Sequence, residues 1–289
     1  MMKRKTNSLP ILEKVFNGSK NDASQKIADI YKKQGYAIVS FLYFANAMKH
    51  RLFEHTDNKK SLNYKDAMLA SDFILPDGIA LELFYYVASW FSKKLVKQKP
   101  KNLNGTDFIP YFLKRLIKQT KDIHMGIFTT YDPVINKTLK EIERAKSNFK
   151  VTYGIDIVYT YAQNYRDLNK NKAFKFDEYE TSLKKANSKW NILLMCTGTP
   201  TQELRVEQNR SFIEKNKILV FNAGGFVDFL SGFETRAPKR VVKAKVLETF
   251  RRIINNPQKN LKKFLVMFGI VRFLLKKLAS TLSKIALKK

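Results

Sequence analysis

The sequence has few of the residues that form disulfide frameworks and metal centres. It contains one cysteine, Cys196, and three dispersed histidines, His50, His55 and His124, and it has no D-x-D pair. A single thiol excludes a disulfide framework and a cysteine metal site, and nothing in the pattern indicates a divalent cation. We therefore expect no metal and no other cofactor. We interpret Cys196 as a small core residue of an apolar strand.

Acidic residues are also scarce. The chain has 25 Asp and Glu against 54 Lys and Arg, a formal net charge of +29. Residues 236–289 contain 16 Lys or Arg and one acidic residue, Glu248, which is about half of that excess. Such a balance predicts an anionic surface or polymer as partner, local to the tail.

Long apolar runs are absent. No window approaches the roughly 18 consecutive apolar residues of a transmembrane helix. The basic N-terminus MMKRKTNSLP is followed by ILEKVFNGSK, which lacks the continuous apolar segment of a signal peptide. We therefore expect a cytoplasmic or peripheral protein. The 289 residues, 44% of them hydrophobic, are enough for one large domain with a sizeable core.

Short apolar runs alternate with helical patterns along residues 37–222, which is typical of an α/β fold with a mainly parallel sheet. Helices are predicted over residues 61–70, 80–91, about 104–120 and 177–186. Two further helices are predicted, one from Pro133 to about residue 147 and one after Pro200. The predicted strands are Ala37 to Phe44, Phe73 to Leu75, Ile123 to Phe128, Lys150 to Val158, Ile192 to Met195 and Ile218 to Phe221.

Two of these strands end in glycine turns, at Gly198 and at Gly224-Gly225. Open α/β sheets bind ligands at the carboxyl ends of their strands, where glycine lets backbone N–H groups approach a phosphate. A nucleotide-type ligand is one interpretation. The other is that the glycines only make tight turns.

The order of short motifs in residues 198–238 favours the first interpretation, a nucleotide-type ligand. It contains GTPTQE, then GGFVDF, then RAP. This ordered set resembles the WecG/TagA/CpsF glycosyltransferases, in which a G-x-P-x-Q-E turn is followed by G-G-x-F-D-F and R-A-P. The resemblance implies a Rossmann-like core over residues 1–235 and a basic helical appendage over residues 236–289.

A further segment, ASDFILPDGIALE, resembles the A-D-x-V-x-P-D-G-I-G signature of the same family. The resemblance implies that the aspartate of the P-D-G sequence, Asp77, is the catalytic base. An aspartate in a turn that leads into a helix is more often a helix cap. Inverting glycosyl transfer needs one carboxylate to take the acceptor proton, and a free aspartate is ionised at neutral pH. The retaining route needs a second, paired carboxylate, and no such motif is present.

Other positions match the family in part. An asparagine at the position of Asn46 is more commonly a helix cap, but the resemblance favours a ligand-facing amide, because Asn46 falls in the family's T-x-N motif with Phe44 in place of the threonine. Thr106 or Asp107 is the expected cap of the helix that follows NGTD, a segment resembling R-V-x-G-x-D-L with Asn102 in place of arginine. The resemblance implies a set of substrate-binding residues, namely Asn46, Gly78, Gly105, Thr106, Asp107, Gly198, Pro200, Gln202, Gly224, Gly225 and Asp228.

The tail from Gln258 to Lys289 has apolar residues at three- and four-residue steps, flanked by lysines and arginines. This pattern indicates a basic amphipathic helix, which could lie on an anionic membrane or could dock on the core or on another subunit. The family's appendage seats the enzyme on the membrane and contributes arginines to the diphosphate. The matching basic residues are Arg236, Arg251, Arg252, Lys262 and Lys263.

The resemblance to this family implies an inverting, metal-independent hexosyltransferase. As the resemblance has it, the enzyme would move an N-acetylmannosamine-like sugar from UDP to a polyprenyl-diphosphate-linked acceptor. It would act at the cytoplasmic face of the membrane, and self-association through the tail is a further expectation. Two alternatives stay open. One is a catalytically silent membrane scaffold of the same fold, suggested by Phe44 and Asn102. The other is a nucleic-acid-binding protein, suggested by the charge.

Overall fold

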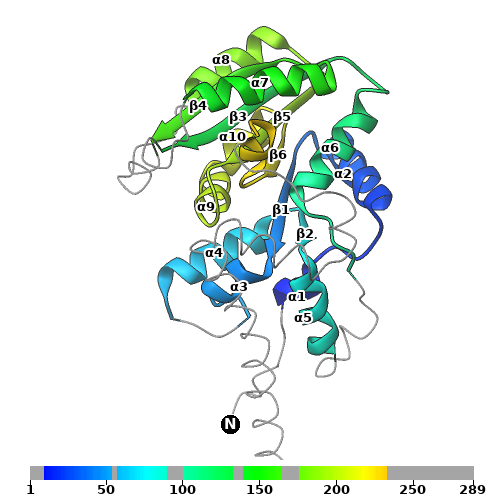
Figure 1. Ribbon diagram of the computed structural model, residues 1–289, viewed down its shortest axis with the longest axis vertical. Helices are drawn as coiled ribbons and strands as arrows, with labels where there is room; N and C mark the ends of the chain where they lie inside the picture. The colour runs from blue at the N-terminus through cyan, green and yellow to red at the C-terminus, as the bar shows by residue number, and fades with distance from the viewer. Residues whose placement is uncertain (1–9, 54–56, 90–99, 133–138, 165–175, 233–289) are drawn as a thin grey trace, which may run out of the picture.

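The computed structural model describes residues 10–53, 57–89, 100–132, 139–164, 176–232. These residues form one six-stranded sheet with helices on both faces (Figure 1). All strand pairs are parallel, in the order β2-β1-β6-β5-β3-β4, which confirms the predicted Rossmann-like α/β class. The strands are β1 Ala37–Tyr43, β2 Phe73–Asp77, β3 Ile123–Tyr131, β4 Ile157–Asn164, β5 Trp190–Cys196 and β6 Ile218–Asn222.

The helices connect these strands and cover both faces of the sheet. Their bounds are α1 Pro10–Lys14, α2 Lys20–Gln34, α3 Phe44–Lys49, α4 Lys59–Ala70, α5 Ile79–Ser89, α6 Gly105–Leu116, α7 Leu139–Tyr153, α8 Phe176–Ala186, α9 Thr201–Gln208, α10 Arg210–Lys215 and α11 Phe226–Leu230.

One face of the sheet packs against α2, α6, α7 and α11 through the largest apolar cluster. Tyr31 of α2 stacks on Trp190 of β5 with ring centroids 4.4 Å apart, and Phe112 of α6 meets Phe221 of β6 edge to face at 5.3 Å. Cys196 lies in this cluster and is buried, as predicted. The near-continuous burial of β1, β5 and β6 follows from this two-sided covering, because a parallel sheet with helices on both faces has no solvated side.

The other face carries two clusters. One joins α1, α3, α4 and α5 to β1 and β2, and the other joins α8, α9 and α10 to the remaining strands. In Figure 1, α3 and α4 lie beside β1 and β2, across the sheet from α2 and α6. Local signals fix the helix ends. Ser19 and Asp22 form a reciprocal capping box at the start of α2, and Gly35 ends it in the left-handed conformation.

The predicted strand from Lys150 to Val158 was wrong in its first half. Helix α7 continues to Tyr153, because Phe149 and Tyr153 extend its buried face by one more turn. Gly154 then ends the helix with φ 65°, and β4 begins at Ile157. Phe44, predicted as the end of a strand, is the first residue of α3.

Candidate active site at the carboxyl edge of the sheet

The sequence motifs come together at one edge of the sheet. Strands β2, β1, β6 and β5 are neighbours in that order, and their carboxyl ends are Asp77, Tyr43, Asn222 and Cys196. Beside them, β3 connects outward to β4 while β5 connects inward to β6. Ligands of open α/β sheets bind where neighbouring connections diverge in this way. This point of divergence lies between β5 and β3, and the sequence motifs extend the candidate active site from there across the ends of β5, β6, β1 and β2.

Asp77 is the last residue of β2 and lies in register with Tyr43 of β1. Its side chain is half-buried. The turn that follows is held from the next segment of the chain. The N–H of Leu103 donates to the carbonyl of Pro76 at 2.7 Å, and the N–H of Gly78 donates to Oδ1 of Asn102 at 2.9 Å. Asn102, where the family has arginine, thus fixes the turn that carries the predicted base.

The predicted cap at Thr106 or Asp107 was wrong, because Asn104 caps α6. Oδ1 of Asn104 accepts from the N–H of Asp107 at 3.0 Å and from the hydroxyl of Thr106 at 2.8 Å. Nδ2 of Asn104 donates back to Oδ2 of Asp107 at 2.9 Å. Asparagine is among the strongest N-cap residues, and the acid three positions later completes a reciprocal pair. Gly105, the first residue of α6, lies against the ring of Phe41.

The turns after β5 and β6 are joined through one buried side chain. Gln202 is 2% exposed, and its Nε2 donates to the carbonyl of Asn222 at 3.1 Å. Its Oε1 accepts from the N–H of Gly224 at 3.0 Å. Gly198 and Gly224 adopt φ 82° and 54°, values that glycine takes without a steric penalty. The two glycine turns therefore form one connected unit.

Pro200 is the N-cap of α9 rather than part of its first turn, so the helix begins at Thr201. Asn46 lies in α3, whose N-cap is Tyr43, so Asn46 does not cap this helix. Asp77 lies in register with Tyr43, which directly precedes α3, so Asn46 and Asp77 belong to neighbouring segments of the edge. Asp228 lies in the first turn of α11, where its N–H donates to the carbonyl of Gly225 at 3.0 Å.

Two further residues of this edge were not selected from the sequence. Glu203 is 1% exposed, and burial raises its pKa to about 7. Arg205 is also buried, and its Nη1 donates to Oε1 of Gln163 near the end of β4 at 3.1 Å. Burial lowers the pKa of Arg205. In the sequence, Glu203 and Arg205 look like ordinary charged surface residues of a short helix. The only signal is that Glu203 is the last residue of the G-x-P-x-Q-E motif.

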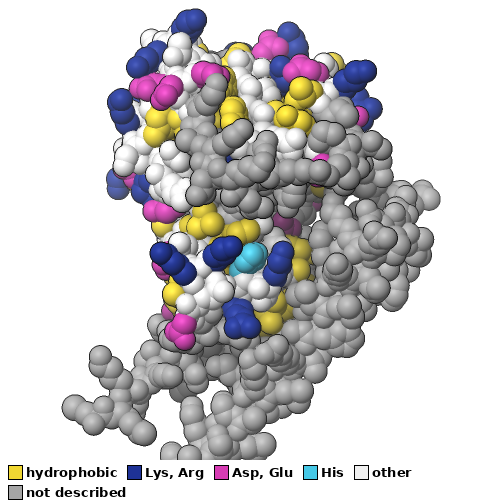
Figure 2. Space-filling model, turned by 90° about the vertical axis from the view of Figure 1, so that its left-hand side faces the viewer, with side chains coloured by type: hydrophobic (Ala, Val, Ile, Leu, Met, Phe, Trp, Pro, Cys, Tyr) yellow, Lys and Arg dark blue, Asp and Glu magenta, His cyan; other side chains and the backbone are white. Residues whose placement is uncertain are grey.

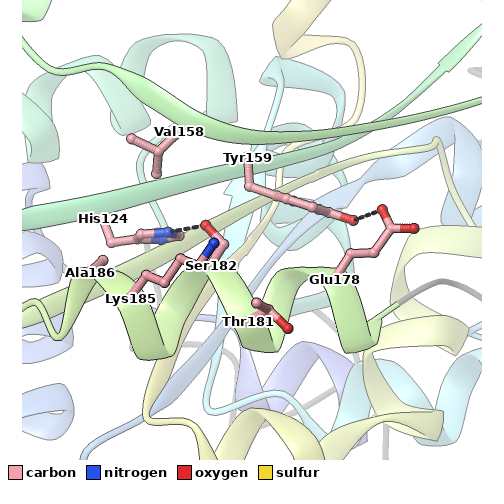
Figure 3. A pocket seen from close by; sticks show the side chains of 8 residues that line it. All are labelled: His124, Val158, Tyr159, Glu178, Thr181, Ser182, Lys185 and Ala186. Atoms are coloured by element: carbon pink, nitrogen blue, oxygen red, sulfur yellow. Dashed lines mark hydrogen bonds between the residues drawn. The ribbon is translucent and has the colours of Figure 1, made fainter.

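A separate groove of about 430 Å³ lies between β4 and α8 (Figure 3). His124 and Ser182 point toward each other there, with Nε2 and Oγ 2.8 Å apart. Burial lowers the pKa of His124. Because His124 is the second residue of β3, this groove lies toward the amino ends of the strands, away from the candidate active site. We assign it no part in the chemistry.

The surface over α3 and α4 carries a group of Lys and Arg side chains (Figure 2). The exposed Lys and Arg residues at the end of α3 and the start of α4 are Lys49, Arg51, Lys59 and Lys60. Within the described ranges, no helix is long and apolar enough to span a membrane, and no cluster of three His, Cys, Asp or Glu residues could hold a metal ion. The basic tail residues Arg236, Arg251, Arg252, Lys262 and Lys263 lie outside the described residues.

Comparison with known proteins decides the family. Residues 11–286 match the family described as glycosyl transferase WecG/TagA/CpsF. The chain belongs to this glycosyltransferase family. A curated relative from Bacillus spizizenii (strain ATCC 23059 / NRRL B-14472 / W23) is 26% identical over 205 residues, which cover 71% of this chain and 68% of the relative. That relative is named N-acetylglucosaminyldiphosphoundecaprenol N-acetyl-beta-D-mannosaminyltransferase.

This membership confirms the predicted family and the predicted enzyme class, a hexosyltransferase. It also agrees with the geometry. The family motifs are spread along the sequence from Asp77 to Asp228, yet in the fold they lie at the ends of adjacent strands. The individual roles of the site residues stay predictions.

Proposed function

We propose that this WecG/TagA/CpsF member transfers an N-acetylhexosamine, N-acetylmannosamine-like, from a UDP-sugar to a polyprenyl-diphosphate-linked sugar. The observation that carries the proposal is the relative's name, which specifies N-acetylmannosaminyl transfer to an N-acetylglucosaminyl-diphosphoundecaprenol. The gathering of the family motifs at one ligand-binding edge supports it. The product would be a lipid-linked intermediate of a cell-surface polysaccharide or a teichoic-acid-type polymer.

In the proposed reaction, Asp77 is the general base. An acceptor hydroxyl attacks the anomeric carbon of the donor sugar, its proton passes to the Asp77 carboxylate, and the bond from the anomeric carbon to the UDP oxygen breaks. One displacement inverts the anomeric configuration, so a single carboxylate suffices. The position of Asp77 at a strand end supports this role, because the hydrogen bonds of Asn102 and Leu103 fix the adjacent backbone.

The donor would lie along the edge from α6 to the two glycine turns. Backbone N–H groups at such turns, together with the starts of α6 and α9, favour a diphosphate. Gln202 would act by fixing the shape of both turns, since its amide is already bonded to Asn222 and Gly224. Asp107 and Asp228 would position the donor from the first turns of α6 and α11.

The basic tail would bring the enzyme to the cytoplasmic face of the membrane as a peripheral protein. Arg236, Arg251 and Arg252 would contact a diphosphate, and Lys262 and Lys263 would face anionic headgroups. The basic surface over α3 and α4 supports this arrangement, because α3 directly follows β1 at the same edge. A glycosyltransferase with a lipid-linked acceptor must reach that lipid from the aqueous side.

We expect transfer to be independent of divalent cations. Charge on the leaving diphosphate would be balanced by arginines and by backbone N–H groups instead. The measurement is the transfer rate after extensive treatment with EDTA, with and without added Mg²⁺ or Mn²⁺. An unchanged rate agrees with the proposal. A loss that Mg²⁺ or Mn²⁺ restores would contradict metal independence.

The experiment that tests the function is UDP release from a panel of UDP-sugars, with and without a short-chain polyprenyl-diphosphate N-acetylglucosamine. We expect one donor to give acceptor-dependent release. Binding of a UDP-sugar without release on any acceptor would instead favour the silent scaffold. A salt-dependent mobility shift with DNA and no association with anionic vesicles would favour the nucleic-acid-binding alternative.

A further inference from the structure

The Glu203 carboxyl group is enclosed beneath the turn that follows β5. Its Oε1 accepts two hydrogen bonds, from Nε2 of Gln202 at 2.9 Å and from Oγ1 of Thr199 at 3.0 Å. Its Oε2 has no hydrogen-bond partner among the described residues and is buried. Burying a carboxyl group costs free energy unless hydrogen bonds compensate, and here only half of the group is compensated. A residue kept at this cost needs a reason beyond packing.

The reason lies in the orientation of Gln202. Its Nε2 donates to both Glu203 and the carbonyl of Asn222, while its Oε1 accepts from the N–H of Gly224. A glutamine amide can rotate by half a turn and exchange its oxygen and nitrogen. In that orientation Nε2 would face the N–H of Gly224, and Oε1 would face two acceptors. Glu203 therefore acts together with the carbonyl of Asn222 and the N–H of Gly224, and it strengthens the orientation of Gln202 that joins the two turns.

We propose that Glu203 is a positioning residue, which holds Thr199 and Gln202 and through them sets the turn after β5 against the turn after β6. This inference rests on the proposed function, because it takes these two turns to be the UDP-sugar site. Glu203 touches no substrate in this account. It acts on the donor through the amide of Gln202 and the backbone of Gly224.

Protonation of Glu203 should be felt at Gln202 and Gly224 if Glu203 positions them. A residue that only fills space would not produce this pH-dependent effect. Burial raises the pKa of Glu203 to about 7, and interactions with the side chain of Gln202, the backbone N–H of Glu203 and the side chain of Thr199 oppose that rise. The titratable group that faces it, among the described residues, is Tyr64 of α4. Burial and the charge of Glu203 raise the pKa of Tyr64 well above its usual value, so Tyr64 stays neutral. Ionised Glu203 accepts charge-assisted hydrogen bonds from both donors on Oε1, whereas a proton taken up by the unpartnered Oε2 removes the charge and weakens both bonds.

The test is nuclear magnetic resonance of the isotope-labelled full chain from about pH 6 to about pH 8, a range that spans the raised pKa. We expect the carboxyl carbon of Glu203, the side-chain amide of Gln202 and the backbone amide of Gly224 to shift with one shared midpoint. Glu203→Gln should abolish the shifts of the two amides. Glu207→Gln, on the same helix but partly exposed, should leave them intact.

Two results would overturn the proposal. One is a Gly224 amide that does not move while the carboxyl of Glu203 titrates in the wild type, a result that needs no variant to fold. The other is the same titration of Gly224 in Glu203→Gln as in the wild type.

Binding of UDP-N-acetylmannosamine separates this inference from the proposed function. Its diphosphate does not titrate in this range. Glu203→Ala should bind it about tenfold more weakly than the wild type, because binding must then order the side chain of Gln202 and the adjoining turns, and Glu207→Gln should bind as the wild type does. Undiminished binding by Glu203→Ala would overturn the positioning role. A wild type that binds no UDP-sugar would contradict the proposed donor, while the shared titration still decides the role of Glu203.

Discussion

Replacing Asp77 with asparagine is expected to reduce acceptor-dependent transfer by roughly a hundredfold to ten-thousandfold, the usual contribution of a general base. Asparagine has nearly the same shape but cannot take the acceptor proton. The fold should survive, because Asp77 is half-buried at the end of β2 and its strand pairing with β1 uses backbone groups. UDP-sugar binding should therefore be retained. The measurement is single-turnover UDP release with acceptor present.

A matched control is Asp66→Asn, which removes a carboxylate from the exposed surface of α4. It should transfer at the wild-type rate. If Asp77→Asn also transfers at that rate, Asp77 is not the base. If Asp77→Asn instead loses both transfer and UDP-sugar binding, Asp77 acts in the donor site and not in proton transfer.

The second large effect concerns the basic tail. Changing Lys262 and Lys263 together to glutamate should weaken binding to vesicles that contain anionic lipid by at least about thirtyfold. Each lysine near such a surface contributes about 1 kcal/mol, and the reversed charge adds repulsion. The measurement is co-sedimentation with vesicles of phosphatidylcholine and phosphatidylglycerol at low salt. Transfer to a water-soluble acceptor should change little.

The control is Lys32→Glu with Lys33→Glu at the exposed end of α2, which makes the same change in net charge within the core. Equal losses in the two double variants would mean that the membrane responds to the overall charge of the protein, not to the tail. Undiminished binding of the tail variant would place the membrane contact elsewhere, with the surface over α3 and α4 as the next candidate.

The strands and most helices could be predicted because their signals are local. Apolar runs such as Ile218 to Phe221 are of strand length and are buried on both faces of the sheet. The boundary near Lys150 could not be predicted in this way. Phe149 and Tyr153 suit a helix or a strand equally, and only their packing against the sheet selects the helix.

For the site, motifs located the segments but not the contacts. The sequence indicated Gln202 and the glycine turns, yet it could not show that the amide of Gln202 reaches Gly224, 22 positions later. Burial of Glu203 depends on α4 covering the start of α9, a contact between distant segments. Its raised pKa therefore has no local signal in the sequence. The same holds for Arg205 of α9, whose partner Gln163 lies on strand β4.

The central claim is hexosamine transfer to a lipid-linked acceptor, and mass spectrometry of the acceptor tests it most directly. The wild-type enzyme would be incubated with UDP-N-acetylmannosamine and a short-chain polyprenyl-diphosphate N-acetylglucosamine. We expect the acceptor to gain one N-acetylhexosamine unit, with an equal amount of UDP released. An acceptor of unchanged mass after full consumption of the donor would show hydrolysis without transfer and would contradict the account.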